Sequence, residues 1–327
     1  MSVSRSLSLR SPALKLAAYG MVLIALLAGG AVVGAAVGPD PSTPAASHDE
    51  ASMATPPSTV PMSSMSMPPV PAGLAIAQDG YRFQLANRVV DAGTPSELRF
   101  VITGPDGDPV TAFDVAHDKQ LHLVIVSRDL ATYAHVHPEL DASGTWTVTA
   151  PAFPAGSYRV YADFVPTGHT GLTLAADLSV PGDFAPQPLP PPSNVATVDG
   201  YEVTFDGTLV AGADSELTVT VSHNGAPATD LDPYLGALGH LVAIRDGDLA
   251  YLHVHPLDEL DGPGGPTVRF SVDVPTPGAY GLFFDFAHAG LVRNASVIVT
   301  AAAAVADGSS NATTAMDMSG DDGTNGG

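Results

Sequence analysis

The sequence predicts an all-β protein in which two antiparallel β-sandwiches follow one another along the chain. Three observations carry this prediction. The 327 residues include 33 glycines and 30 prolines, which favours short strands with many turns over a helical bundle. Short apolar segments alternate with turn residues roughly every eight to twelve positions. The chain also repeats itself with a period of about 120 residues, which is the size of a complete sandwich.

The N-terminal segment, residues 1–38, is predicted to be a membrane helix or a signal peptide. Three basic residues, Arg5, Arg10 and Lys15, precede the uncharged apolar run Leu16–Val37. At about 1.5 Å per residue this run can span a bilayer, and the basic flank places the N-terminus in the cytoplasm. We therefore expect a single-pass protein of the cell membrane with its bulk outside the cytoplasm. Secretion after cleavage of a signal peptide is the alternative.

Three further segments have the composition of linkers. Residues 39–73 are rich in Pro, Ser and Met, and residues 303–327 read as a disordered tail. Residues 183–196 form a proline-rich spacer, which is expected to be stiff and extended. Few contacts should cross such a spacer, so each repeat is expected to fold alone.

The two repeats, residues 74–182 and 197–302, share matched motifs. Asp79-Gly80-Tyr81 corresponds to Asp199-Gly200-Tyr201, and His135-Val136-His137-Pro138 corresponds to His253-Val254-His255-Pro256. Each copy has its own set of predicted strands. In the first copy these are LRFVIT, LHLVIV, WTVTA, SYRVYADF and LTLAADLSV; in the second they are LTVTV, HLVAI, VRFSVDV, AYGLFFDF and ASVIVT.

Eight of the eleven histidines lie at matched positions of the repeats. In the second copy Asp246-Gly247 is a favoured two-residue hairpin loop, which would place His240 opposite His253. The same argument with Arg128-Asp129 as the loop places His122 opposite His135. His137 and His255 follow two residues later and so lie on the same face of the sheet.

Counting antiparallel strands brings a fourth histidine to the same end of each sandwich: His169 in the first copy and His288 in the second. Asp163 and Asp285, near the ends of their strands, are candidate accessory ligands. Neutral imidazoles suit copper, zinc and nickel, so the sequence predicts one metal site in each repeat. The alternative is that these histidines only complete hydrogen-bond networks. His48, His117 and His223 have no counterparts and are expected to be incidental, although the last two lie near the same ends.

Methionine is the only sulfur-containing residue type in the chain. The chain has no cysteine, which excludes disulfides, thiolate zinc sites and the usual blue-copper site. Five methionines in the predicted linker and tail are candidate thioether ligands for Cu(I), and ordinary low-complexity linker is the alternative. They are Met62, Met65, Met67, Met316 and Met318.

The H-L-V…H-x-H-P pattern, present twice, resembles exported heavy-metal-binding proteins of actinobacterial type. It is also loosely similar to YtkA-like and CopC-like domains. The resemblance implies Ig-like or cupredoxin-like antiparallel β-sandwiches. It also implies an extracytoplasmic, non-enzymatic protein that sequesters, delivers or senses copper. The copper would be bound as Cu(II) or Cu(I), and zinc is the second candidate metal. The first copy departs from the pattern at Phe113–Gln120, where the second has Tyr234-Leu235-Gly236-Ala237.

The expected partners are a metal ion and a membrane or exported metal-handling protein. Nucleic acid is excluded, because a formal net charge of −22 repels phosphate. Two other functions stay open. One is an Ig-like surface interaction module with structural histidines. The other, less favoured, is a metal-dependent enzyme, for which the sequence offers no H-E-x-x-H motif.

Overall fold

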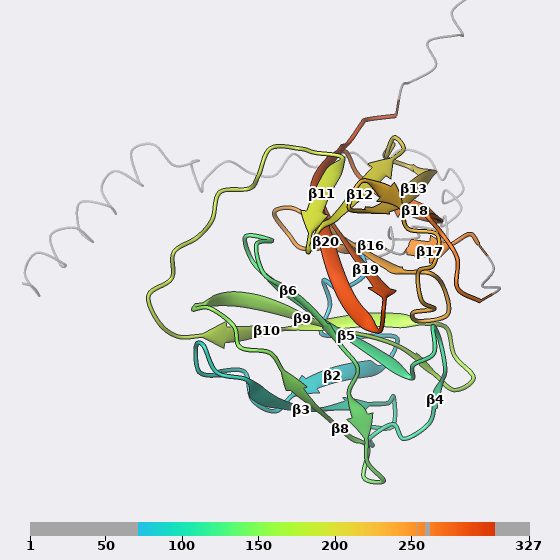
Figure 1. Cartoon of the computed structure of the whole chain (residues 1–327). Helices are drawn as coiled ribbons and strands as arrows, with labels where there is room; N and C mark the ends of the chain where they lie inside the picture. Colours follow the sequence, from blue (N-terminus) through green and yellow to red (C-terminus); the bar gives the residue numbers. More distant parts are fainter. Residues whose placement is uncertain (1–70, 253, 259–261, 305–327) are drawn as a thin grey trace, which may run out of the picture. The chain divides into compact units, whose positions relative to one another are not determined.

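The computed structural model describes residues 71–252, 254–258 and 262–304, which belong to one compact unit (Figure 1). The predicted membrane or signal segment, most of the first linker, nearly all of the tail, the five candidate methionines and His253 lie outside the described residues. Among the described residues, no helix is long and apolar enough to cross a membrane.

The first repeat consists of two antiparallel sheets, which confirms the predicted sandwich. One sheet has the order β1 (Ala77–Gln78), β2 (Tyr81–Leu85), β3 (Ser96–Thr103), β8 (Thr145–Ala150) and β7 (Glu139–Leu140). The other has the order β10 (Leu172–Val180), β9 (Gly156–Pro166), β5 (Leu121–Ser127) and β6 (Tyr133–Val136), with β4 (Phe113–Asp114) paired to β9.

The second repeat has the same arrangement. Its first sheet has the order β11 (Val195–Val198), β12 (Tyr201–Asp206), β13 (Ala213–His223), β18 (Thr267–Val274) and β17 (Val254–Pro256), with β14 (Ala226–Pro227) paired to β13. Its second sheet has the order β16 (Tyr251–Leu252), β15 (His240–Arg245), β19 (Gly278–His288) and β20 (Leu291–Ala301). Every pairing between these strands is antiparallel.

The strand order is that of an immunoglobulin-type sandwich. Strands β2, β3, β8 and β7 take the places of A, B, E and D, and β10, β9, β5 and β6 take those of G, F, C and C′. Both repeats also have the tyrosine corner of this fold, in which a tyrosine hydroxyl near the start of the F strand donates to a carbonyl four residues earlier. Tyr158 bonds to Pro154 at 2.8 Å, and Tyr280 bonds to Thr276 at 2.7 Å.

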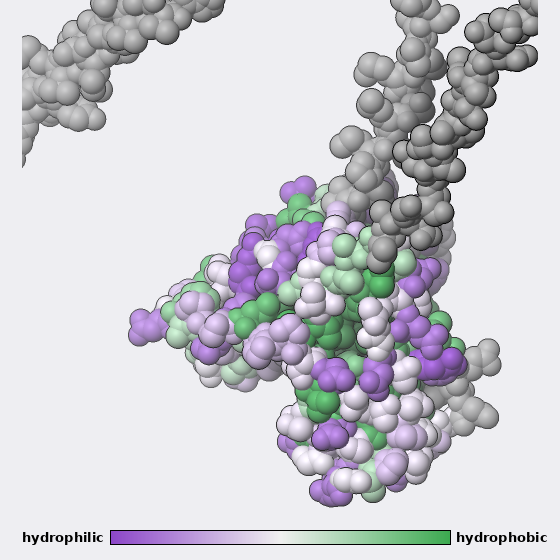
Figure 2. Space-filling model, turned by 90° about the horizontal axis from the view of Figure 1, so that it is seen from above, coloured by the Kyte–Doolittle hydropathy of each residue, from purple (hydrophilic) through white to green (hydrophobic). Residues whose placement is uncertain are grey.

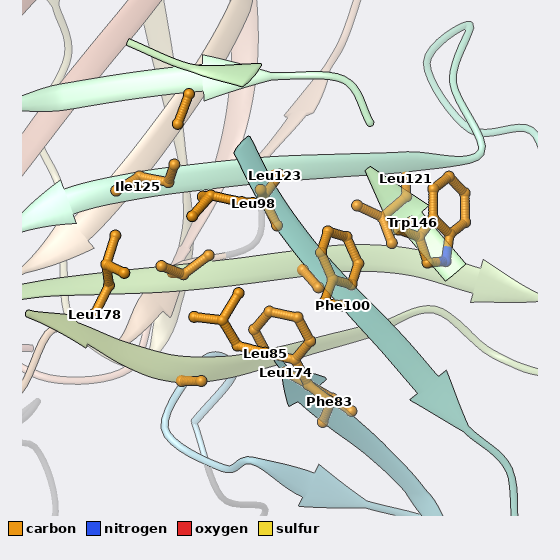
Figure 3. Close-up of a cluster of buried hydrophobic side chains, with 14 of the residues drawn as sticks. Phe83, Leu85, Leu98, Phe100, Leu121, Leu123, Ile125, Trp146, Leu174 and Leu178 are labelled. Carbon is orange, nitrogen blue, oxygen red and sulfur yellow. The ribbon is translucent and has the colours of Figure 1, made fainter. Parts of the chain in front are cut away.

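Each sandwich has its own hydrophobic core, built from alternate residues of its strands. In the first repeat Leu121, Leu123 and Ile125 of β5 belong to one core with Phe100 and Trp146, and Figure 3 shows Leu121 beside Trp146. The second core contains Phe284 and Phe286 of β19 among other apolar residues. On the face seen in Figure 2, hydrophilic and apolar residues are mixed.

A third core joins the repeats, and it corrects the expectation that few contacts cross the spacer. The outer faces of the two four-stranded sheets bury the following apolar side chains together: Val124, Val126, Leu130, Tyr161 and Ala175 from the first repeat, and Val242, Ile244, Leu249, Tyr251, Phe283 and Ile298 from the second. The Tyr161 hydroxyl also donates to the Leu249 carbonyl at 2.7 Å. Strand β5 is therefore buried on both faces, and the repeats are docked rather than independent.

Candidate metal centre

The candidate centre lies on the outer faces of β5 and β15, where the repeats meet. On β5, His122 has the same parity as Val124 and Val126, so its side chain faces the third core. His240, at the start of β15, is its counterpart. In the register of the sheets, His122 lies opposite Asp163 of β9 and His240 lies opposite Asp285 of β19.

The β5–β6 hairpin has a register that differs from the predicted one by two residues, because Val124, not His122, lies opposite His135. The loop is longer than two residues, with the Leu130 amide bonded to the Ser127 carbonyl and Leu130 in the left-handed region (φ 59°). Side chains alternate with a period of two, so the shift leaves His135 on the predicted face. In the second repeat the corresponding shift is seen in Ala243 opposite Leu252.

Four imidazoles from the two repeats form one compact cluster. The ring centroids of His122, His135 and His137 lie 4.9–5.2 Å apart. His240 of the second repeat lies 4.8 Å from His135 and 5.3 Å from His122, against which it stacks in parallel. Among the described residues, which do not include His253, the imidazoles that gather into triads lie between the repeats rather than within each one.

The carboxylate of Asp285 anchors this cluster from the second repeat. It accepts hydrogen bonds from His135 Nδ1 at 2.9 Å, from the Tyr133 hydroxyl at 3.1 Å and from Asn294 Nδ2 at 2.8 Å. The side chains of His135 and Asp285 are only 2% and 6% exposed. Potential ligand atoms lie within 4.8 Å of one another in two overlapping triads: His122 with His135 and His137, and His135 with His240 and Asp285.

The outer hydrogen bonds determine which nitrogen of His122 and which nitrogen of His135 can act as a ligand. His122 Nε2 lies 3.1 Å from the Ala116 carbonyl, which can only accept, so Nε2 carries the proton and Nδ1 has a free lone pair. His135 Nδ1 donates to Asp285, so its Nε2 has a free lone pair. These two acceptor nitrogens face each other at 3.0 Å. Such an arrangement requires a cation between them, either a proton or a metal ion.

Two further nitrogens of the cluster are buried without a hydrogen-bond partner in the described part of the chain. They are Nε2 of His137 and Nδ1 of His240. A buried polar atom without a partner costs about 1–3 kcal/mol, and one explanation of such an atom is a bound ion. The cluster therefore offers four imidazole nitrogens that are not committed to other groups.

Burial favours the neutral form of three of these imidazoles, those of His122, His137 and His240. Desolvation, aided by the neighbouring His135, lowers the pKa of His122 to about 4 and that of His137 to about 3. Burial likewise lowers the pKa of His240 well below its ordinary value. Because only the neutral ring can bind a metal, the environment holds them ready as ligands.

The structure does not bring His169 or His288 to this cluster. His288 has the parity of Phe284 and Phe286, so it lies on the core side of β19 and bonds to the Tyr201 hydroxyl at 2.6 Å and to Asp230 at 3.1 Å. His169 packs edge-on against Tyr81, the counterpart of Tyr201, at 5.4 Å. His288 therefore lies on the face of its sheet opposite to the cluster, and His169 lies in the turn between β9 and β10.

Other candidate residues also have different positions from those expected. His255 is exposed on β17, which pairs with β18 of the other sheet and not with β15. Asp163 accepts from the Thr173 hydroxyl at 3.0 Å and belongs to neither triad. His223 stacks on Tyr201 at 4.2 Å.

Sequence reasoning did not identify Tyr133 and Asn294 as partners of Asp285, nor the contribution of both repeats to one cluster. One signal was present: apolar residues occupy both parities of β5, which indicates a strand buried on both faces. This signal implies that another part of the protein covers the outer face of β5, where His122 lies.

Comparison with known proteins gives a family but no activity. No curated protein matches the sequence. Among solved structures, the Escherichia coli adhesin FdeC has 15% identity and a TM-score of 0.24, over 70% of this chain and 66% of that one. Salmonella α-2-macroglobulin has 16% identity and a TM-score of 0.25, over 70% and 15%. The titin domains z1z2 in complex with telethonin have 15% identity and a TM-score of 0.18, over 69% and 98%. Residues 76–181 and 196–303, which make up more than half of the chain, match the family described as Domain of unknown function (DUF8832), and the protein belongs to that family.

Proposed function

We propose that this protein binds one divalent transition-metal ion between its repeats, through His122 Nδ1, His135 Nε2, His137 Nε2 and His240 Nδ1. The observation that carries the proposal is the pair of acceptor nitrogens of His122 and His135, which face each other at 3.0 Å while their other nitrogens are held by Ala116 and Asp285.

The spacing of that pair fits a shared ion. With metal–nitrogen bonds of about 2.0–2.1 Å, two ligand nitrogens are about 3.3 Å apart in a tetrahedral site and about 2.9 Å apart when adjacent in a square plane. The observed 3.0 Å lies between these values. Both rings would have to turn so that their lone pairs converge on a Zn(II) or Cu(II) ion beside the line that joins the two nitrogens.

Asp285 acts in this proposal as the outer partner of His135 and not as a ligand. A metal-bound histidine commonly donates its second N–H to a carboxylate, which fixes the ring and raises its basicity. If Asp285 bound the ion through the second triad, its bonds to His135 and Tyr133 would have to rearrange. Binding through the first triad, completed by His240, leaves them in place.

The main competing arrangement is a proton shared by His122 and His135, with the cluster serving only to hold the repeats together. That arrangement corresponds to the surface-module alternative. It leaves the buried nitrogens of His137 and His240 without partners, whereas a metal ion would use them. This difference favours the metal.

We further propose that the metal is copper, with zinc as second candidate, and that the role is sequestration, delivery or sensing outside the cytoplasm rather than catalysis. All four proposed ligands are imidazoles, which suit Cu(II) and Zn(II). The resemblance of the H-x-H-P pattern to exported heavy-metal-binding proteins and the N-terminal apolar run support an exported, membrane-anchored protein. The methionine-rich segments would add Cu(I) sites, to be exchanged with a membrane or exported metal-handling partner.

Metal titration of the full chain tests the proposal. We expect one tightly bound Cu(II) or Zn(II) per chain, loss of that site in His122→Ala with His137→Ala, and loss also in His240→Ala of the other repeat. His169→Ala is the matched control, because it removes an imidazole of the first repeat outside the cluster. Absence of tight binding in the wild type, or equal loss in the control, would contradict the proposal.

A further inference from the structure

His117 lies at the tip of a tight turn that closes over the cluster. Ala116 and Lys119 exchange backbone hydrogen bonds of 2.9 and 3.1 Å, and the two central residues, His117 and Asp118, both have positive φ (49° and 62°). This is a type I′ turn, in which glycine, asparagine and aspartate are preferred. A histidine in the left-handed region is uncommon and costs on the order of 1 kcal/mol.

The second repeat has the same turn with a different tip. Tyr234 and Ala237 exchange hydrogen bonds of 2.8 and 3.3 Å around Leu235 and Gly236, which have φ values of 55° and 78°. Leu235 is 6% exposed, so packing explains its conformation. His117, the residue at the corresponding place, is only half-buried. Packing is therefore a weaker explanation for His117, and its neighbours must show whether it has another role.

The position of His117 supplies that role. Its ring lies 6.1 Å from that of His122 and 5.7 Å from that of His240, so it adjoins the cluster without belonging to either triad. It also lines, with His122 and Lys119, a surface hollow of about 280 Å³. His122 is 2% exposed, whereas His117, which lines the same hollow, is partly exposed.

The same turn is coupled to the cluster through its backbone. The carbonyl of Ala116, which precedes His117, accepts from His122 Nε2 and so directs His122 Nδ1 toward His135. One turn thus carries a partly exposed imidazole and sets the tautomer of the buried one. Ligand exchange at a metal is easier when an incoming ligand binds before the previous one leaves. An imidazole beside the buried set can provide that intermediate step.

We propose that His117 is a capture ligand, which takes the metal ion from solvent and transfers it to His122 and His240 without remaining bound. This inference rests on the proposed metal site. It predicts that His117 changes how fast the ion enters and leaves, and changes the affinity little. A resident ligand would change the affinity instead.

Stopped-flow mixing of the full chain with Cu(II), followed by tyrosine fluorescence, tests the inference, and a competing chelator gives the release rate. His117→Asn keeps a residue that tolerates the left-handed region, and His117→Gly relieves the strain entirely. In both variants we expect uptake and release to slow by the same factor, so that Kd stays close to that of the wild type. His223→Ala, a histidine of the other repeat remote from the triads, should leave both rates unchanged.

The outcomes separate the two proposals. Unchanged rates in both His117 variants would overturn the capture role and leave the metal site intact. A loss of affinity as large as that of His122→Ala would also overturn it, because His117 would then be a resident ligand. If the wild type binds no Cu(II), the metal site itself is refuted, and the capture role with it.

Discussion

Replacing Asp285 by asparagine tests the hydrogen bonds that prepare the cluster. The carboxylate accepts from His135, Tyr133 and Asn294, and it is nearly buried. Asparagine has the same shape but no charge. If its NH₂ group faces His135, that ring must accept at Nδ1 and carry its proton on Nε2, which then cannot bind a metal. If its oxygen faces His135, the tautomer is kept but the ring becomes a weaker base.

Either orientation should weaken the metal site. Loss of an outer partner typically reduces metal affinity by about 10- to 100-fold, which corresponds to about 1.4–2.7 kcal/mol. The metal-free protein should also lose stability, since a hydrogen bond to a charged group contributes about 1.5–3 kcal/mol. Because Asp285 bridges to His135 of the other repeat, both losses arise at the junction between repeats.

The assay is a competition titration with a chelator of known affinity at pH 7.5, together with nitrogen NMR of the imidazoles to identify their tautomers. Asp177→Asn is the control, because it removes the same charge from a carboxylate whose side chain is 80% exposed on β10. An affinity for Cu(II) and Zn(II) equal to that of the wild type, with unchanged imidazole signals, would refute the argument from tautomers.

Three other predictions concern stability. The pKa of His122 is lowered to about 4 by burial, so the unfolded chain binds more protons than the folded chain between about pH 4 and 6.5. The stability that neutral His122 gives the metal-free protein is therefore complete above about pH 6.5 and is lost toward pH 4. At pH 5 this residue alone should cost about 2 kcal/mol, which denaturant unfolding at pH 5 and above pH 6.5 measures. Phe283→Ala, at a position 2% exposed in the third core, should cost about 3–5 kcal/mol and lower one common unfolding transition; two separate transitions, of which only the second moves, would contradict this. Gly239→Ala would place a methyl group against the Phe284 ring beside His240, and should lower both the melting temperature and the metal affinity; unchanged values of both would count against the described packing.

The sandwiches could be predicted because their signals are local. Alternating apolar residues marked most of the strands, and the duplication marked the domain organisation. The faces of His122 and His135 were also predictable, because a register shift of two residues preserves side-chain parity. These inferences depend only on neighbours in one hairpin.

The rest of the site depends on contacts between residues far apart in the chain. His135 and Asp285 are joined by a hydrogen bond across the repeat junction, and no local pattern specifies it. The proline-rich spacer also suggested that the two repeats are separate. However, its Gln187 amide donates to Asp129 of the first repeat and its Ser193 amide donates to the Ile298 carbonyl of the second, so the spacer is bonded to both repeats. A stiff, extended segment can connect docked domains as well as separated ones.

The histidine cluster is built from residues of both copies of the duplicated sequence. His122 and His240 are equivalent residues that stack on one another, yet their surroundings differ, because His122 belongs to the triad of the first repeat and His240 to the triad that contains Asp285. Of the residues that the structure describes, the first repeat supplies three imidazoles to the triads and the second supplies one imidazole with the carboxylate, and docking combines them. A ligand that binds the docked state alone stabilises it by about 2.7 kcal/mol at a hundred times its Kd. If the metal binds only the docked state, a partner that binds only the separated repeats would weaken metal binding, and the metal would weaken the partner's binding by the same factor.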